Sequence, residues 1–257
     1  MRSAKQLGGA LTKLQRAEEH LGQLVAEHQS FVHERNPYRM LREADPEPNC
    51  YVWRAKIVEP PPLEKWGSIA GECVHALRSA LDHTAFELVR FRNPAATYSE
   101  FPIYVNGIGQ DSWDTRGKFK LPGVDRKVMA QAKWLQPYRR AERHDPLWRV
   151  HRLDIIDKHR HLNIVSPYLR AARYTPVGGT VADVINLAGP FEDGTPVARF
   201  KMIPDPGSTM MNVKTEFTFD ISFGEGEVLT AEPVMQSLEN LRVYVGFVVA
   251  RFDRFFS

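Results

Sequence analysis

The sequence predicts an α+β fold, in which a bundle of long helices is combined with a mostly antiparallel sheet. Apolar residues recur every three or four positions over three long segments, at about 4–34, 63–91 and 233–255, and this is the period of an amphipathic helix. Apolar and polar residues alternate over 49–59 and within short runs between 161 and 223, which is the period of a strand. We therefore expect the sheet to consist of the 49–59 strand and a 161–223 meander.

The first part of the chain supplies two of the long helices and the first strand. The helix over 4–34 has an apolar stripe with charged residues between its members, at Leu14, Ala17, Leu21, Leu24, His28 and Phe31. Pro37 helps to end this helix, because proline cannot continue the backbone hydrogen bonds. Three prolines at 60–62 end the strand over 49–59 for the same reason. The helix over 63–91 ends before Pro94.

Two shorter helices and a series of strands follow. We expect helices over 125–134 and over about 146–158, the second capped by Asp145 with proline at its first position. Turns that contain glycine or proline separate the strands of the meander. These strands are expected at 161–169, 180–187, 197–203 and 212–223.

The end of the chain returns to a helical pattern. The helix over 233–255 shows one apolar stripe, at Val234, Leu238, Leu241, Val245, Val248 and Phe252. No internal repeat divides the sequence. We expect one domain over 1–257, with a helical core and a strand-rich section, at 1–160 with 231–257 and at 161–230.

The composition is that of a globular protein with a buried core. Of the 257 residues, 43% are hydrophobic and 11% aromatic, which excludes disordered and collagen-like classes. The longest apolar run near the end, Val243 to Ala250, is far shorter than the roughly 20 residues of a membrane span, so we expect no membrane partner. Cys50 and Cys73 are too few for a disulfide framework, and we expect reduced thiols and a cytoplasmic location.

The formal net charge of +3 is unevenly distributed. The segment over 116–160 carries 13 Lys or Arg and five Asp or Glu residues, a net charge of +8, so the rest of the chain carries −5. A basic segment of this kind indicates an anionic partner such as RNA. We expect Arg139, Arg140 and Arg143 to contact phosphates, and the alternative is a solvated face with scattered salt bridges.

The 72–90 part of the helix over 63–91 has a polar face of unusual composition. The residues of this face are Glu72, His75, Ser79, Asp82, His83, Glu87 and Arg90, with Arg78 at the border. Most solvated helix faces are built from Lys and Glu with Ala or Gln. Two His, an Arg, an Asp and a Ser so close together could instead bind or transform an anion.

The segment from Arg78 to His83 fits the pattern R-x4-H and resembles the signature of HEPN domains (higher eukaryotes and prokaryotes nucleotide-binding). The resemblance implies a metal-independent ribonuclease without a cofactor, of the kind found among toxins and defence effectors. It also implies that Arg78 holds the scissile phosphate and that His83 is the general acid or base in 2′-hydroxyl attack. Ser79 would assist, and Asp82 would orient Arg78.

Helix geometry constrains this hypothesis. Arg78 and His83 are about 140° apart around the helix and about 7.5 Å apart along it, so one helix does not aim both at one atom. Two copies related by a two-fold axis could do so, and we expect a homodimer through the 63–91 helix. The alternative is that Arg78 and Asp82 form a surface pair and that His83 packs at an edge.

A second concentration of polar residues lies between 147 and 161. Its members include His151, Asp154, Lys158 and His159, and apolar residues flank the stripe that contains the first three. Such a stripe tends to face another element, and the polar face of the 72–90 helix, with His75, is the expected partner. The alternative function is then a non-catalytic assembly or binding protein, in which these helix faces form an internal polar network.

A metal site is a further alternative. Glu72 and His75 have the i, i+3 spacing used by di-iron bundles, which would make the protein a metal-dependent hydrolase or oxidase. A second Glu-x-x-His helix, which such a site needs, does not occur in the sequence. Glycine-rich phosphate loops and the G-x-S-x-G motif are also missing, and we expect neither a metal nor a cofactor.

Overall fold

The computed structural model describes residues 6–104, 113–139, 144–159, 162, 164–208, 212–224 and 228–256. It confirms the α+β class, being 51% helical and 26% strand with antiparallel sheets. The chain divides into two compact units. Unit 1 comprises the described residues within 1–23, 67–162 and 236–257, and unit 2 those within 24–66 and 163–235. The expectation of a single domain over 1–257 stays a prediction.

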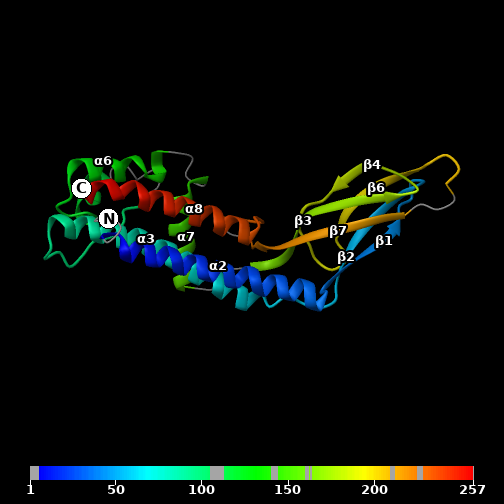
Figure 1. Cartoon of the computed structure of the whole chain (residues 1–257), viewed down its shortest axis with the longest axis horizontal. Helices are drawn as coiled ribbons and strands as arrows, with labels where there is room; N and C mark the ends of the chain where they lie inside the picture. The colour runs from blue at the N-terminus through cyan, green and yellow to red at the C-terminus, as the bar shows by residue number, and fades with distance from the viewer. Residues whose placement is uncertain are drawn as a thin grey trace. The chain divides into compact units, whose positions relative to one another are not determined.

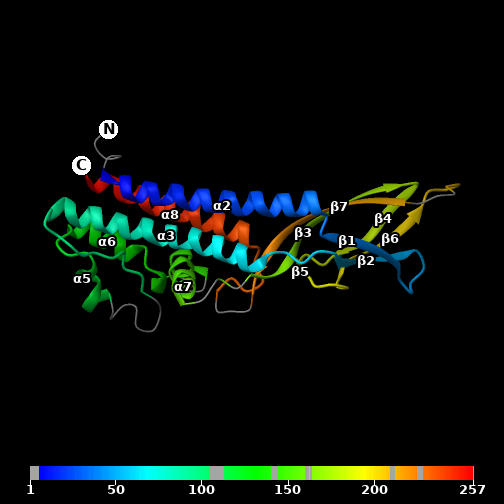
Figure 2. The ribbon, with the colours of Figure 1, turned by 90° about the horizontal axis from the view of Figure 1, so that it is seen from below.

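The three predicted long helices are present, as α2 (Gly8–Arg35), α3 (Leu63–Arg92) and α8 (Val234–Asp253). Within unit 1 they run alongside one another (Figure 1 and Figure 2). Their inward faces are buried, with Ala10, Ala17 and Leu21 from α2, Leu77, Leu81 and Leu88 from α3, and Leu241, Val245 and Phe252 from α8. The apolar stripes read from the sequence therefore supply much of the core of this unit. Leu24, His28 and Phe31 of the α2 stripe belong to unit 2.

Shorter helices complete unit 1. The main ones are α6 (Arg126–Trp134) and α7 (Pro146–His159), with single turns at η1 (Trp113–Gly117), α5 (Lys118–Lys120), η2 (Pro137–Arg139) and η4 (Arg254–Phe256). Asp145 caps α7 as predicted, because its Oδ1 accepts hydrogen bonds from the backbone N–H of Leu147, at 2.9 Å, and of Trp148, at 3.4 Å. This cap fixes the start of α7. In Figure 2, α7 lies beside α3.

Unit 2 contains two antiparallel sheets, whereas the sequence analysis expected one. The first has the order β1-β2-β6-β4, with β1 (Tyr38–Ala44), β2 (Cys50–Ile57), β6 (Pro196–Pro204) and β4 (Gly179–Asn186). The second has the order β5-β3-β7, with β5 (Gly189–Pro190), β3 (Ile164–Val177) and β7 (Asn212–Phe223). The strand β1 was not predicted, because it is an edge strand in which Tyr38 alone is buried, so its sequence lacks apolar alternation.

The core of unit 2 lies between the sheets. Phe200 and Met202 of β6 form a buried cluster with Val213 of β7. Partly buried side chains from both sheets pack around it, at Tyr51, Trp53, Tyr174 and Val181. Face-to-face packing of this kind accounts for the alternation that marked these strands in the sequence.

None of the helices in the described part of the chain is both long enough and apolar enough to cross a membrane.

Candidate functional site

A connected polar cluster of unit 1 surrounds Arg78 of α3, whose side chain is almost fully buried (the residue is 4% exposed). Its Nη2 donates to Oε1 of Glu100 and to the carbonyl oxygen of Phe101, each at 3.1 Å, and lies 3.0 Å from Oδ1 of Asp82. The same oxygen of Asp82 accepts a hydrogen bond from the backbone N–H of Phe101 at 2.9 Å. Arg78 and Asp82 therefore hold the segment around Phe101 against α3.

Glu100 connects this cluster to a second cation. Lys120 donates to Oε1 of Glu100 at 2.7 Å, and the hydroxyl of Tyr98 donates to Oε2 at 3.3 Å. Burial alone would raise the pKa of Glu100, but the hydrogen bond and charge of Lys120, with the charge of Arg78, lower it. Burial raises the pKa of Asp82, against the opposing effect of Arg78. We call Arg78, Asp82, Glu100 and Lys120 the Arg78 cluster.

His151 of α7 lies in the field of this cluster. Burial, followed by the charges of Arg78 and Lys120, lowers the pKa of His151 to about 4, so its imidazole is neutral at pH 7. Nδ1 of His151 and Nη1 of Arg78 are buried and have no hydrogen-bond partner within the described part of the chain. A neutral histidine between cations is poorly placed to donate a proton as a general acid.

The polar stripe of α7 meets α3 at a second cluster. Asp154 is 1% exposed; its Oδ1 lies 2.9 Å from Nδ1 of His75, and its Oδ2 accepts from Nζ of Lys158 at 2.6 Å. The helices approach closely here, because a Cβ added at Gly71 would lie 1.9 Å from Oδ1 of Asp157. The α7 stripe therefore faces the polar side of α3, the arrangement expected from the sequence.

His83 lies in different surroundings. A Cβ added at Gly9 would lie 2.5 Å from Nδ1 of His83, so this imidazole lies against α2. Arg78 instead contacts Glu100 and Phe101. Within one chain the structure thus brings Arg78 and Asp82 together but not Arg78 and His83. Ser79, the next residue of α3 after Arg78, is half-buried.

The remaining candidate residues are dispersed. His159 is exposed at the end of α7, and Arg139 is exposed in η2. Arg140 and Arg143 lie outside the described residues. Glu72 is exposed, while Nδ1 of His75 lies against Asp154. Among the residues that the structure describes, no group of three His, Cys, Asp or Glu side chains is arranged to hold a metal ion, so Glu72 and His75 gain no further ligand.

Glu100 and Lys120 were not among the candidates from the sequence. Both lie in a segment whose sequence has no helical or strand periodicity. Glu100 contacts Arg78 over 22 residues of chain, and Lys120 contacts Glu100 over 20. The one local signal was an acidic residue directly before the apolar Phe101-Pro102 pair, and this is too common a pattern to indicate a partner for Arg78.

The two cysteines are unpaired and buried. Cys73 packs against α2, where its Sγ lies 3.4 Å from the carbonyl oxygen of Ala17. Burial raises the pKa of its thiol to about 12. Because the thiolate is the nucleophilic form, this residue is inert at neutral pH.

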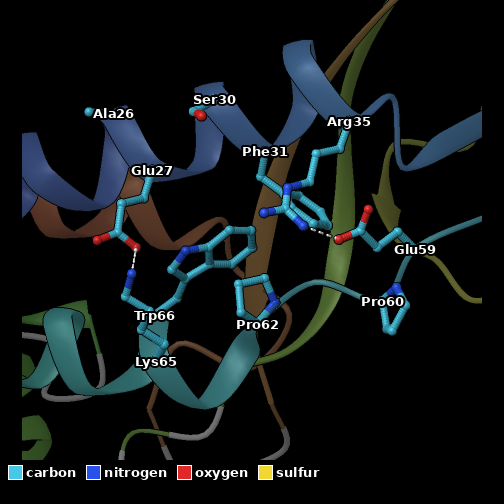
Figure 3. Close-up of a pocket in the computed structure, with 10 residues that line it drawn as sticks. All are labelled: Ala26, Glu27, Ser30, Phe31, Arg35, Glu59, Pro60, Pro62, Lys65 and Trp66. Atoms are coloured by element: carbon cyan, nitrogen blue, oxygen red, sulfur yellow. Dashed lines mark hydrogen bonds and ion pairs between the residues drawn. The ribbon is translucent and has the colours of Figure 1, made fainter.

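Unit 2 contains a groove of about 590 Å³ between the end of α2 and the segment before α3, shown in Figure 3. Two ion pairs flank it: Arg35 with Glu59 at 2.6 Å, and Lys65 with Glu27 at 2.8 Å. The indole of Trp66, which is buried, lies between them. Since these four charged side chains are already paired with one another, the groove offers little free charge to a ligand.

Comparison with protein-family models, curated proteins and solved structures gives no match to this chain.

Proposed function

We propose that the protein is a non-catalytic binding or assembly protein, in which the Arg, Asp and His side chains of α3 and α7 form an internal polar network. The observation that carries this proposal is the enclosure of Arg78, which is 4% exposed and donates to Glu100 and Phe101. A residue that holds a scissile phosphate must be reachable by RNA. Arg78 instead donates hydrogen bonds to Glu100 and Phe101 of its own chain.

The position of His83 supports the same proposal. The HEPN resemblance requires Arg78 and His83 to converge on one phosphate, but His83 lies against Gly9 of α2. Convergence would then need a second chain, and the homodimer through the 63–91 helix stays a prediction. The contacts of RNA with Arg139, Arg140 and Arg143 stay predictions as well.

The energetics of buried charge give the network a physical role. Removing one member of an ion pair leaves the partner uncompensated, and the cost is largest where that partner is buried, as Arg78 and Asp154 are. The Arg78 cluster joins α3 to the segment around Phe101 and to α5, and Asp154 joins α3 to α7. The polar network therefore joins the helices of unit 1 to one another. This role fits a scaffold protein that binds its partners through other residues on its surface.

A cleavage assay with matched variants tests the proposal. We expect the purified protein not to cleave single-stranded RNA in EDTA, and Arg78→Ala to lower the melting temperature far more than His83→Ala. The ribonuclease hypothesis predicts the reverse pattern, with cleavage by the wild type that both substitutions abolish while the fold persists. That second result would overturn the proposal.

A further inference from the structure

A second pocket, of about 600 Å³, lies in unit 1 where α6 meets the end of α8 and η4. Its lining residues are Lys127, Ala130, Gln131 and Trp134 of α6 with Arg254 and Phe255 of η4. The volume is within the range of roughly 300–1,000 Å³ that is usual for small-ligand sites. None of these residues belongs to the Arg78 cluster.

Aromatic rings lie beside cations both in the lining of this pocket and next to it, where Arg251 contacts the lining residue Trp134. Trp134 is 48% exposed, which is high for so large an apolar ring. The guanidinium of Arg251 lies 5.1 Å from the centre of the Trp134 ring and 5.2 Å from that of Phe247, and Arg254 lies 4.9 Å from that of Phe255. Exposed rings next to guanidinium groups form a surface on which a flat, electron-rich ring can stack.

The pocket also contains a buried donor with no partner. Gln131 is 8% exposed, and its Oε1 accepts a hydrogen bond from Nη2 of Arg254 at 2.7 Å. Its Nε2 is buried and has no hydrogen-bond partner among the described residues. Because Arg254 occupies the amide oxygen, Gln131 presents N–H groups to a ligand and would favour a carbonyl oxygen.

The charge of the pocket is positive. Lys127 is exposed and forms no ion pair with the residues that the structure describes, and Arg254, which donates to Gln131, adds a second cation. The lining residues in the described part of the chain include no carboxylate, and Asp253 is a chain neighbour of Arg254 rather than a member of the lining. The pocket therefore combines a stacking surface, a hydrogen-bond donor and cations for phosphate.

We propose that this pocket binds a nucleobase of a single-stranded nucleic acid. The base stacks on Trp134, one of its carbonyl oxygens accepts a hydrogen bond from Nε2 of Gln131, and the flanking phosphates lie against Lys127 and Arg254. Uracil and thymine have carbonyl oxygens on the base edge and adenine has none, so the pocket favours oligo(U) or oligo(dT) over oligo(A). This inference goes beyond the proposed internal network and does not depend on it.

Fluorescence anisotropy with labelled 12-nucleotide oligo(U), oligo(dT) and oligo(A) at low salt tests the proposal. We expect tighter binding of oligo(U) and oligo(dT) than of oligo(A). Trp134→Ala should weaken binding roughly tenfold, since stacking on one aromatic side chain is worth about 1–3 kcal/mol per base. Lys127→Ala should reduce the slope of log affinity against log salt by roughly 0.7, the value for one phosphate of a single strand.

Two further variants make the result decisive. Gln131→Leu should remove the preference for pyrimidines while leaving the binding of oligo(A) nearly unchanged. Phe119→Ala, an exposed aromatic outside the pocket, is the matched control and should bind like the wild type, and thermal unfolding monitors the fold of every variant. Wild-type protein that binds none of the strands, or Trp134→Ala and Lys127→Ala proteins that bind like Phe119→Ala, would overturn the proposal.

Discussion

Nη2 of Arg78 and Oε1 of Glu100 lie 3.1 Å apart, and the same carboxylate oxygen accepts a hydrogen bond from Lys120. A carboxylate shared by two cations in a partly buried setting is coupled to both of them. The HEPN resemblance assigns the guanidinium of Arg78 to a phosphate, but its positive charge is already compensated by the carboxylates of Glu100 and Asp82. Arg78 and Glu100 are therefore expected to behave as one structural unit.

A double-mutant cycle measures this coupling. We expect Arg78→Ala to destabilise the protein by about 1–3 kcal/mol, because Glu100, Asp82 and the carbonyl of Phe101 lose a hydrogen-bonded cation while both carboxylates keep some contact with water. Glu100→Ala should also destabilise it, and the double variant should be less destabilised than the sum of the two, by about 0.5–3 kcal/mol. Urea unfolding of the four proteins gives these values, and strict additivity would contradict the coupling.

The packing of α3 against the segment after α7 predicts opposite effects for two glycine substitutions. Gly67→Ala should destabilise the protein, because its Cβ would meet the backbone carbonyl oxygen of Leu162 at 2.6 Å and backbone cannot easily move aside. Gly22→Ala in α2 is the matched control, since no atom lies within 4 Å of its added Cβ. That variant should gain about 0.5–1 kcal/mol from helix propensity. Thermal unfolding of the two variants checks the contrast, which equal shifts in melting temperature would refute.

Acid should destabilise the protein through His28. Burial, with a smaller effect of His33, lowers the pKa of His28 from 6.5 to about 4. Between these pH values the unfolded chain binds a proton that the folded chain excludes, so the free energy of unfolding falls as the pH falls from about 6.5 to 4. His28→Phe keeps the ring beside Trp66, whose centre is 5.5 Å away, and should show a smaller loss between pH 7 and pH 5.

His151 contributes a loss of the same sign, because its pKa is also lowered to about 4. The His28→Phe protein should therefore keep part of the acid destabilisation rather than lose all of it. Urea unfolding at several pH values compares the variant with the wild type. Parallel pH profiles for the two proteins would contradict a titrating role for His28.

Asp220 of β7 should destabilise the protein as the pH rises, which is opposite to the effect of His28 and His151. Burial raises its pKa from 3.8 to about 6, against backbone hydrogen bonds from Ile221 and Met235 and the charge of Arg170. The folded chain then binds a proton that the unfolded chain has released, so the free energy of unfolding falls as the pH rises from about 4 to 6. Asp220→Asn should be more stable than the wild type at pH 8, and the difference should shrink towards pH 4. A constant difference across this range would show that the pKa of Asp220 is the same in the folded and the unfolded chain.

The sequence predicted the helices well because their signals are local. Apolar stripes located α2, α3 and α8 to within a few residues, and Asp145 with Pro146 located the start of α7. The angle of about 140° between Arg78 and His83 around the helix also predicted that the two side chains face different neighbours. In each case the information lies within a few turns of one helix.

The sequence could not predict what depends on distant pairing. The division of the strands between two sheets follows from pairs such as β2 with β6, which join positions about 150 residues apart. The contacts of Glu100 with Arg78 and of Lys120 with Glu100 were not predicted for the same reason, since neither the loop around Glu100 nor the single turn α5 has a periodic pattern that would indicate them. The sequence therefore identified the chemistry on α3 but not the partners that neutralise it.

The division into units has a consequence for the order of folding during synthesis. Unit 2 is complete once the ribosome has released the residues up to Met235, whereas unit 1 also requires 236–257. The apolar faces of α2 and α3 in unit 1 must therefore wait for α8, although both helices were translated well before it. At roughly 5–20 residues per second this wait lasts many seconds, during which the nascent chain exposes the surface that α8 will cover.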